Sequence, residues 1–178
     1  DGAGWGVYAQ LFDLAGTKVG SEFRVNTNLS SDQVNPDVAV LDTRHIVVVW
    51  HDQSDSSIRG QLYTAGGVSI GGEFAVSTGD FNSDYGDLPH VTALDNGGFV
   101  VSWDGYSSLS DSGYGVYAQR YNAAGMAQDA EFRVNTYTTD VQTRPSIAMD
   151  ADGDFVVVWE SINQDGDRAG TYAQRYDA

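Results

Sequence analysis

Short segments of alternating and continuous apolar residues recur along the chain, separated by clusters of Gly, Asp and Asn. A period of two, with many β-branched and aromatic residues, is typical of β-strands. For example, Tyr117, Gln119 and Tyr121 should share one face of a strand, and Val116 and Ala118 the opposite face. No stretch has the apolar spacing of an amphipathic helix. The pattern therefore predicts an all-β protein.

An internal repeat organises these segments. A motif that runs from Pro to Trp without a gap occurs at residues 36–50, 89–103 and 145–159, and its Trp residues are 53 and 56 positions apart. Two further motifs follow it, of the types Gly-Val-Tyr-Ala-Gln-Arg-Tyr and Glu-Phe-Arg-Val-Asn-Thr. Each unit thus holds four strand-like segments: A begins at the Pro, B ends at the Trp, C carries the Gln and D carries Glu-Phe. The C motif lies at residues 6–12, 57–63, 115–121 and 170–176, and the D motif at 22–27, 73–78 and 131–136.

These motifs predict one repeat domain over residues 1–178, with about three four-stranded units of 53–56 residues. It contains a partial unit (1–27, segments C and D), two full units (36–78 and 89–136) and a unit that lacks its last strand (145–178). Segment B is apolar on both faces, so both faces should be buried, as in a blade of a β-propeller. A β-trefoil is the alternative, although the chain holds one segment more than three units of four would supply.

The number of units bears on assembly. Propellers have roughly 4–8 blades, so three units alone should not close a ring. We therefore expect the chain to associate with itself, for example as two copies that complete one ring.

Charge and composition exclude several classes of partner. Nine Lys and Arg against 25 Asp and Glu give a net charge of −16, which excludes nucleic acid, since phosphate binding needs a basic face. The same charge disfavours anionic membrane surfaces, and apolar runs such as residues 155–159 are too short for membrane insertion. Without Cys the chain has no disulfide, thiolate metal site or Cys nucleophile.

The repeat motifs carry a resemblance to a known group of proteins. The sequence Gly-Val-Tyr-Ala-Gln-Arg-Tyr, then Glu-Phe-Arg-Val-Asn-Thr, then Pro-Ser-Ile-Ala-Met-Asp-Ala-Asp-Gly-Asp-Phe-Val-Val-Val-Trp resembles tandem repeats of long secreted bacterial proteins of the RTX, adhesin-like kind. The resemblance covers essentially the whole chain. It implies a secreted or cell-surface location, calcium-rich surroundings and a binding or adhesive role. The first unit departs from the pattern, with Asp42-Thr43-Arg44-His45 in place of the Asp/Gly turn and Arg59 in place of the motif Tyr.

Signatures of catalysis are absent from the sequence. The histidines are His45, His51 and His90, and none lies in a recognised catalytic motif. The chain has no zinc-protease motif, phosphate-binding loop or nucleophile elbow. We expect a non-enzymatic protein. An unrecognised glycoside hydrolase remains an alternative, because 25 acids could supply a pair of catalytic carboxylates.

Exposed aromatic residues are the candidate ligand platforms. Carbohydrates bind flat, partly apolar rings that have polar neighbours. Trp50, Trp103 and Trp159 end apolar strands, so core packing is the expected role for these three. The candidates are instead four aromatic residues in loops, where Trp5 and Tyr114 align with each other just before segment C: Trp5, Tyr85, Tyr106 and Tyr114.

Acidic turns are the candidate metal sites. Asp150, Asp152 and Asp154 alternate in one turn, and Asp165 and Asp167 lie in the loop before the last segment C. Closely spaced carboxylates suit Ca²⁺. The alternative is structural, since Asp and Gly also serve the backbone geometry of hairpin turns and solvated loops.

Two further repeated residues have expected structural roles. The Gln of segment C (Gln10, Gln61, Gln119 and Gln174) should bond the neighbouring backbone and fix strand register. The prolines should begin strand A, where a missing N–H is tolerated. Together, these observations favour a secreted, lectin-like module that binds a glycan or cell-surface polysaccharide. It requires no cofactor, unless its binding depends on Ca²⁺ at the acidic turns. The main alternative is a structural, self-assembling segment of a large adhesin.

Overall fold

The computed structural model describes residues 4–41, 44–77, 88–106, 114–150 and 152–177. These residues form thirteen β-strands and no helix, so the predicted all-β class is confirmed. The strands are β1 (Tyr8–Phe12), β2 (Lys18–Arg24), β3 (Gln33–Val40), β4 (Ile46–Asp52), β5 (Ser57–Tyr63), β6 (Ser69–Ala75), β7 (His90–Ala93), β8 (Phe99–Gly105), β9 (Gly115–Tyr121), β10 (Ala127–Arg133), β11 (Gln142–Met149), β12 (Phe155–Ile162) and β13 (Ala169–Tyr176). Within the described ranges no helix could cross a membrane.

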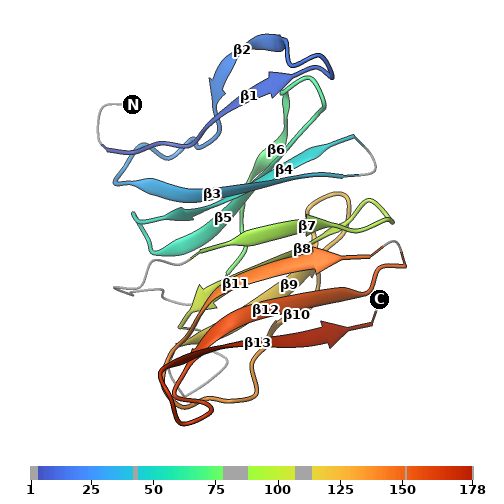
Figure 1. Ribbon diagram of the computed structural model, residues 1–178. Helices are drawn as coiled ribbons and strands as arrows, with labels where there is room; N and C mark the ends of the chain where they lie inside the picture. The colour runs from blue at the N-terminus through green and yellow to red at the C-terminus, as the bar shows by residue number, and fades with distance from the viewer. Residues whose placement is uncertain (1–3, 42–43, 78–87, 107–113, 151, 178) are drawn as a thin grey trace.

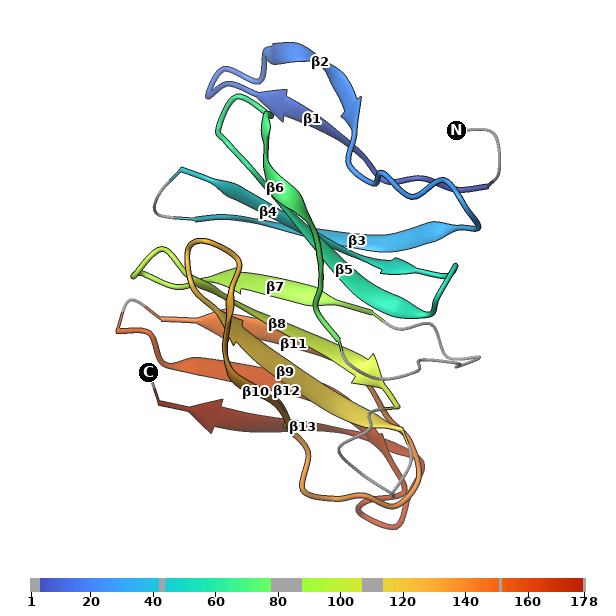
Figure 2. The ribbon, with the colours of Figure 1, turned by 180° about the vertical axis from the view of Figure 1, so that it is seen from behind.

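The strands form four antiparallel sheets in chain order. Their strand orders are β1-β2, β3-β4-β5-β6, β10-β9-β8-β7 and β11-β12-β13. In Figures 1 and 2 the sheets follow one another from the blue end to the red end of the chain. Within each four-stranded sheet, segments A to D occupy successive strands. Closure of such sheets into a ring, and the number of blades in it, stay predictions.

The core lies between successive sheets. One cluster joins the second and third sheets through residues such as Val49 and Trp103, and another joins the third and fourth sheets through residues such as Val100 and Phe155. Tyr117 and Tyr121 belong to the first of these clusters. The side chains of Val116 and Ala118 belong to the other, which confirms the predicted division of strand faces.

Strand B is buried on both faces where sheets lie on both sides. Every residue of β8 is buried, whereas buried and half-buried residues alternate along β12 in the last sheet. Trp50 and Trp103 are fully buried and Trp159 is nearly so, which confirms their predicted place in the core.

In three of the four C segments the Gln bonds the paired D strand, as predicted, whereas the Gln174 amide donates to the Arg175 carbonyl of its own strand. The Gln61 side-chain amide donates to the Ile70 carbonyl at 3.0 Å, and that of Gln119 to the Gln128 carbonyl at 2.9 Å. Gln10 reaches the Val19 carbonyl at 3.3 Å. Each bond lies where the register between the two strands shifts.

The expected position of the prolines is wrong for two units. Strand β3 begins at Gln33 and β11 at Gln142, so Pro36 and Pro145 lie inside strand A. Both prolines coincide with a shift of register against strand B. A bulge leaves one residue out of the ladder, so the missing N–H of proline is tolerated there. Only Pro89 directly precedes its strand.

Candidate functional site

Trp5 lines a groove beside the start of strand β3. The groove has a volume of about 570 Å³ and is lined by Trp5, Gly6, Val7, Tyr8, Gln33, Val34, Asn35, Pro36 and Gln53. Trp5 is 74% exposed and Tyr8 is 48% exposed. None of the described lining residues carries a charged side chain; Asn35 and Gln53 supply amide groups, whereas the Gln33 amide is buried. The groove thus combines open aromatic rings with uncharged hydrogen-bonding groups.

The backbone of Trp5 is held on both sides by the next segment of chain. Its N–H donates to Asp32 Oδ1 at 2.8 Å, and its carbonyl accepts from the Gln33 N–H at 2.8 Å. The preceding Gly4 has φ of 148°, and a Cβ there would lie 2.1 Å from Asp32 Oδ1. A glycine is required at this position because the carboxylate approaches the backbone so closely. These contacts place Trp5 even though its ring is exposed.

Buried amides support the floor of the groove. Asn26 Nδ2 donates to Gln33 Oε1 at 2.8 Å, and Asn26 Oδ1 accepts from the Val7 N–H at 2.8 Å. Gln33 Nε2 donates to the Ser30 carbonyl at 2.9 Å. Because Asn26 and Gln33 are both buried, their side chains connect three segments of chain behind the exposed rings.

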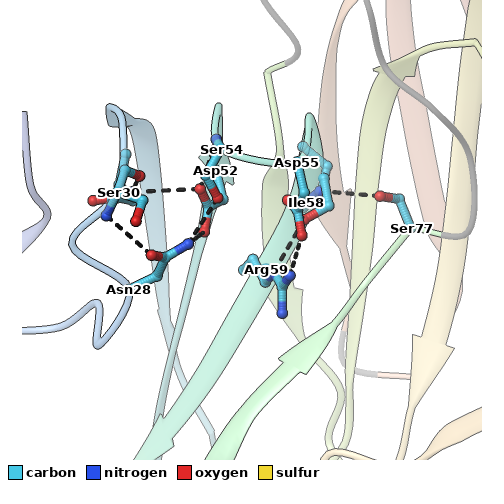
Figure 3. Close-up of polar contacts among 10 residues, drawn as sticks. Asn28, Ser30, Asp52, Ser54, Asp55, Ile58, Arg59 and Ser77 are labelled. Carbon is cyan, nitrogen blue, oxygen red and sulfur yellow. Dashed lines mark hydrogen bonds and ion pairs between the residues drawn. The ribbon is translucent and has the colours of Figure 1, made fainter.

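A second layer of polar contacts surrounds Asp52 (Figure 3). Asn28 Nδ2 donates to Asp52 Oδ2 at 3.1 Å, and the Ser54 N–H donates to Asp52 Oδ1 at 3.0 Å. Burial alone would raise the pKa of Asp52, but hydrogen bonds from Ser54, Gln33 and Asn28 outweigh it and lower the pKa below its ordinary value. Asp52 is therefore a fixed anion that orders the loop behind the groove.

The other predicted aromatic residues do not join Trp5. Tyr114 is 3% exposed and packs edge-on against Tyr106, with ring centroids 5.4 Å apart. Tyr106 keeps 45% of its surface exposed, and Tyr85 lies outside the described residues. The structure thus gives different surroundings to Trp5 and Tyr114, although the two align in sequence. Of the described candidates, Trp5 alone lines the groove beside β3.

The predicted metal ligands form turn contacts. Asp150 Oδ1 accepts from the N–H groups of Asp152 and Asp154 at 3.0 and 3.1 Å. Asp154 forms an ion pair with Arg175, and Asp165 accepts from the Asp167 N–H at 3.2 Å. Across the described ranges, no three His, Asp or Glu side chains gather closely enough to hold a metal ion. Calcium binding by these turns stays a prediction.

A second groove lies between turns of the third and fourth sheets. It has a volume of about 700 Å³, and its lining includes Asp95, Arg120, Asp129 and Asp152. The Arg120 guanidinium lies 5.1 Å from the centre of the Phe155 ring and donates to the Asp177 carbonyl at 2.6 Å. Three carboxylates line this groove, and none of its described lining residues is an exposed aromatic residue. In both respects it differs from the groove at Trp5.

The sequence pattern points to Trp5 but not to the polar residues that line its groove. Gln33, Asn35 and Gln53 were not singled out, although a signal existed for Gln33. The pair Asn135 and Gln142 has the same separation of seven residues as Asn26 and Gln33, and its amides also bond at 2.8 Å. A repeated Asn and Gln at constant spacing could therefore have located the floor of the groove.

Comparison with known proteins adds information about the fold. No family model and no curated protein matches the chain. A protein of unknown function from Dyadobacter fermentans DSM 18053 matches 97% of the chain with a TM-score of 0.56 and 14% identity. An ulvan lyase bound to -[GlcA(1-4)Rha3S]- matches 87% with a TM-score of 0.54 and 12% identity. The endo-arabinase from Bacteroides thetaiotaomicron VPI-5482 matches 82% with a TM-score of 0.51 and 12% identity.

The chain spans only part of these structures. It covers 50% of the Dyadobacter protein, 43% of the ulvan lyase and 56% of the endo-arabinase. At such low identity the likeness shows a shared β-rich fold and carries no residue of one protein onto another.

Proposed function

We propose that the chain is a non-enzymatic carbohydrate-binding module and that the groove at Trp5 holds the sugar. The exposure of Trp5 beside uncharged amides carries this proposal. A sugar ring offers an apolar face to an aromatic ring and hydroxyl groups to amides, so both features of the groove are used. None of the described residues that line the groove carries a charged side chain, which suits a neutral sugar.

Two further observations support the proposal. Two of the structures with a similar fold are named for action on carbohydrates, the endo-arabinase and the ulvan lyase. The repeat motifs resemble those of secreted adhesin-like proteins, so we place the module outside the cell. In that setting Ca²⁺ is the cofactor to test, at Asp150, Asp152, Asp154, Asp165 and Asp167.

A glycan array tests the proposal, probed with the wild-type chain and with Trp5→Ala, in calcium buffer and in chelator. We expect binding by the wild type and loss of about tenfold or more in affinity for Trp5→Ala, because the stacking surface is removed. Leu14→Ala is the matched control, since Leu14 is an exposed apolar residue outside the groove. Unchanged affinity of Trp5→Ala would reject the site. Loss of binding in chelator would assign a role to calcium.

Self-association is a second candidate function, favoured by one face of the first sheet. Tyr63, Tyr121 and Tyr176 end their C strands and pack onto the preceding sheet. Phe12 occupies the same motif position in β1 and is 58% exposed. A second copy that covers this face would give a mass in solution that is a multiple of 19.1 kDa. Phe12→Asp should then yield a monomer, whereas a wild-type monomer would exclude this candidate.

A further inference from the structure

The A strands β3, β7 and β11 each begin a sheet and, among the described residues, pair with one strand only. β7 packs against both β3 and β11, and it lies between them in both views (Figures 1 and 2). The unpaired edge of a strand carries backbone N–H groups that need acceptors. The acceptors found along these edges therefore show what the edges can bind.

Between β3 and β7 the acceptor is a carboxylate. Asp37 Oδ2 accepts from the Val91 N–H at 2.8 Å, and Asp37 Oδ1 accepts from the Val38 N–H at 2.9 Å. The same Oδ2 lies 3.5 Å from His90 Nδ1. One carboxylate is thus held by N–H groups of two A strands and by an imidazole.

Between β7 and β11 the same N–H group is present without a carboxylate. Ile147 of β11 corresponds to Val91 of β7, since each lies two residues after the Pro of its motif. The Asp150 N–H donates to the Asp154 carbonyl, and N–H groups alternate in direction along an antiparallel strand. The Ile147 N–H therefore points away from β12, and within the described ranges no hydrogen bond from it to a side chain or loop is found.

The residues beside this N–H repeat the arrangement that holds Asp37. Ser146 corresponds to His90, because each directly follows the Pro of its motif. The Ser146 hydroxyl and the Ile147 N–H therefore stand on β11 as the His90 imidazole and the Val91 N–H stand on β7. His90 itself has the position of Asp37, so the third and fourth sheets have an imidazole where the second has a carboxylate. Its side chain is 40% exposed, which leaves it open to a small ligand.

The charged groups around His90 are few. On β3 it faces Asp37, the one charged partner within ion-pair distance of it among the described residues. Arg144 of β11 pairs instead with Glu160 at 3.0 Å, and Asp104 of β8 accepts from the Arg144 N–H at 2.9 Å. A protonated imidazole donates from both nitrogens, so His90 can serve Asp37 and a ligand at the same time.

We propose that the facing edges of β7 and β11 bind the carboxylate of a small acidic ligand, through the Ile147 N–H, the Ser146 hydroxyl and the protonated His90 imidazole. The ligand carboxylate takes the place that the Asp37 side chain has between β3 and β7. Sugar acids and acidic amino acids share this group. The site has no residue in common with the groove at Trp5, so it does not depend on the function proposed for that groove.

Amide resonances of the ¹⁵N-labelled chain test the site. Sodium acetate, glucuronate, N-acetylglutamate and glucose are titrated separately at about pH 5.5, where an imidazole is protonated and Asp37 stays ionised because its pKa is lowered. We expect the Ile147 amide proton to move downfield and to saturate with each carboxylate, whereas the Val91 amide, already bound by Asp37, stays in place. The tighter of glucuronate and N-acetylglutamate identifies the source of the carboxylate. At about pH 8 neutral His90 donates from one nitrogen only, so binding should be about tenfold weaker.

Variants locate the binding. His90→Ala should bind acetate about tenfold more weakly, and His45→Ala is the matched control, which should bind as the wild type does. His90→Asp supplies the carboxylate from the chain itself, so its Ile147 amide should already lie downfield without ligand and should no longer respond to acetate. The other amide resonances report whether each variant is folded. An Ile147 amide that ignores acetate, that moves equally with glucose or sodium chloride, or that responds equally in His90→Ala and His45→Ala would overturn the proposal.

Discussion

The hydroxyl of Tyr121 donates a hydrogen bond of 3.1 Å to the backbone carbonyl of Val76, which belongs to the preceding repeat. The same bond joins Tyr63 to Val25 at 3.0 Å and Tyr176 to Val134 at 3.3 Å. Each tyrosine ring also packs against a Phe of the preceding D strand, with centroids 5.3 to 5.6 Å apart. Every interface between successive sheets therefore has the same polar and aromatic contact at the same place.

Removal of the Tyr121 hydroxyl should lower the free energy of unfolding. Tyr121→Phe leaves a buried carbonyl without its donor, which costs about 1–3 kcal/mol. Urea unfolding followed by tryptophan fluorescence measures the change. Phe12→Tyr is the reverse substitution at the equivalent, exposed position of β1, and it should leave stability unchanged. Equal effects of the two substitutions would show that the hydrogen bond from Tyr121 to Val76 adds nothing to the free energy of unfolding.

Gly60→Ala should also destabilise the chain. The added Cβ would lie 2.6 Å from the Phe74 ring, so the ring or the strand must shift, at a cost of about 1–3 kcal/mol. Gly72→Ala in the neighbouring strand is the control, because a Cβ there meets no atom within 4 Å. The same urea experiment compares the two variants. A Gly60→Ala chain as stable as the control would mean that the strands separate easily here.

Gly4→Ala should weaken glycan binding without touching a ligand contact. The new Cβ would displace the Asp32 carboxylate, and with it the hydrogen bond that holds the Trp5 backbone. We expect a loss of affinity of about tenfold, measured by calorimetry with the best sugar from the array. Gly16→Ala serves as the control, since Gly16 also has positive φ but has open space around it. Full affinity in Gly4→Ala would mean that Trp5 needs no such support.

Acid should remove a stabilising contribution of Asp37. Burial alone would raise the pKa of Asp37, but hydrogen bonds from His90 and from the N–H groups of Val91 and Val38 outweigh it and lower the pKa below 3.8. As the pH falls, the unfolded chain therefore takes up this proton first, and the contribution is lost as the pH passes through the folded-state pKa.

Asp37→Asn tests this dependence. Between about pH 6 and about pH 3, the free energy of unfolding should fall more steeply for the wild type than for the variant. Urea midpoints at several pH values measure both slopes. Parallel slopes would contradict a lowered pKa at Asp37.

The class of fold and the strand segments were predictable from the sequence for a local reason. Successive residues of a strand point to opposite faces of the sheet. Tyr117 and Tyr121 could therefore be assigned to one face, and Val116 and Ala118 to the other, without knowledge of the neighbouring strands. The repeat then showed that Gln10, Gln61 and Gln119 must have one common role. The bulges at Pro36 and Pro145 were missed because they depend on pairing with strand B.

The candidate site could be predicted only in part. Trp5 and Tyr114 occupy equivalent sequence positions, yet one is 74% exposed and the other 3% exposed. Exposure depends on the segments that pack around a residue, and these come from distant parts of the chain. In the same way, Gln33 and Gln53 join Trp5 only through the fold. The strands, the repeat and the two faces of each strand follow from local sequence. Which aromatic ring stays open depends on the packing of distant segments, because burial is a property of neighbours in space.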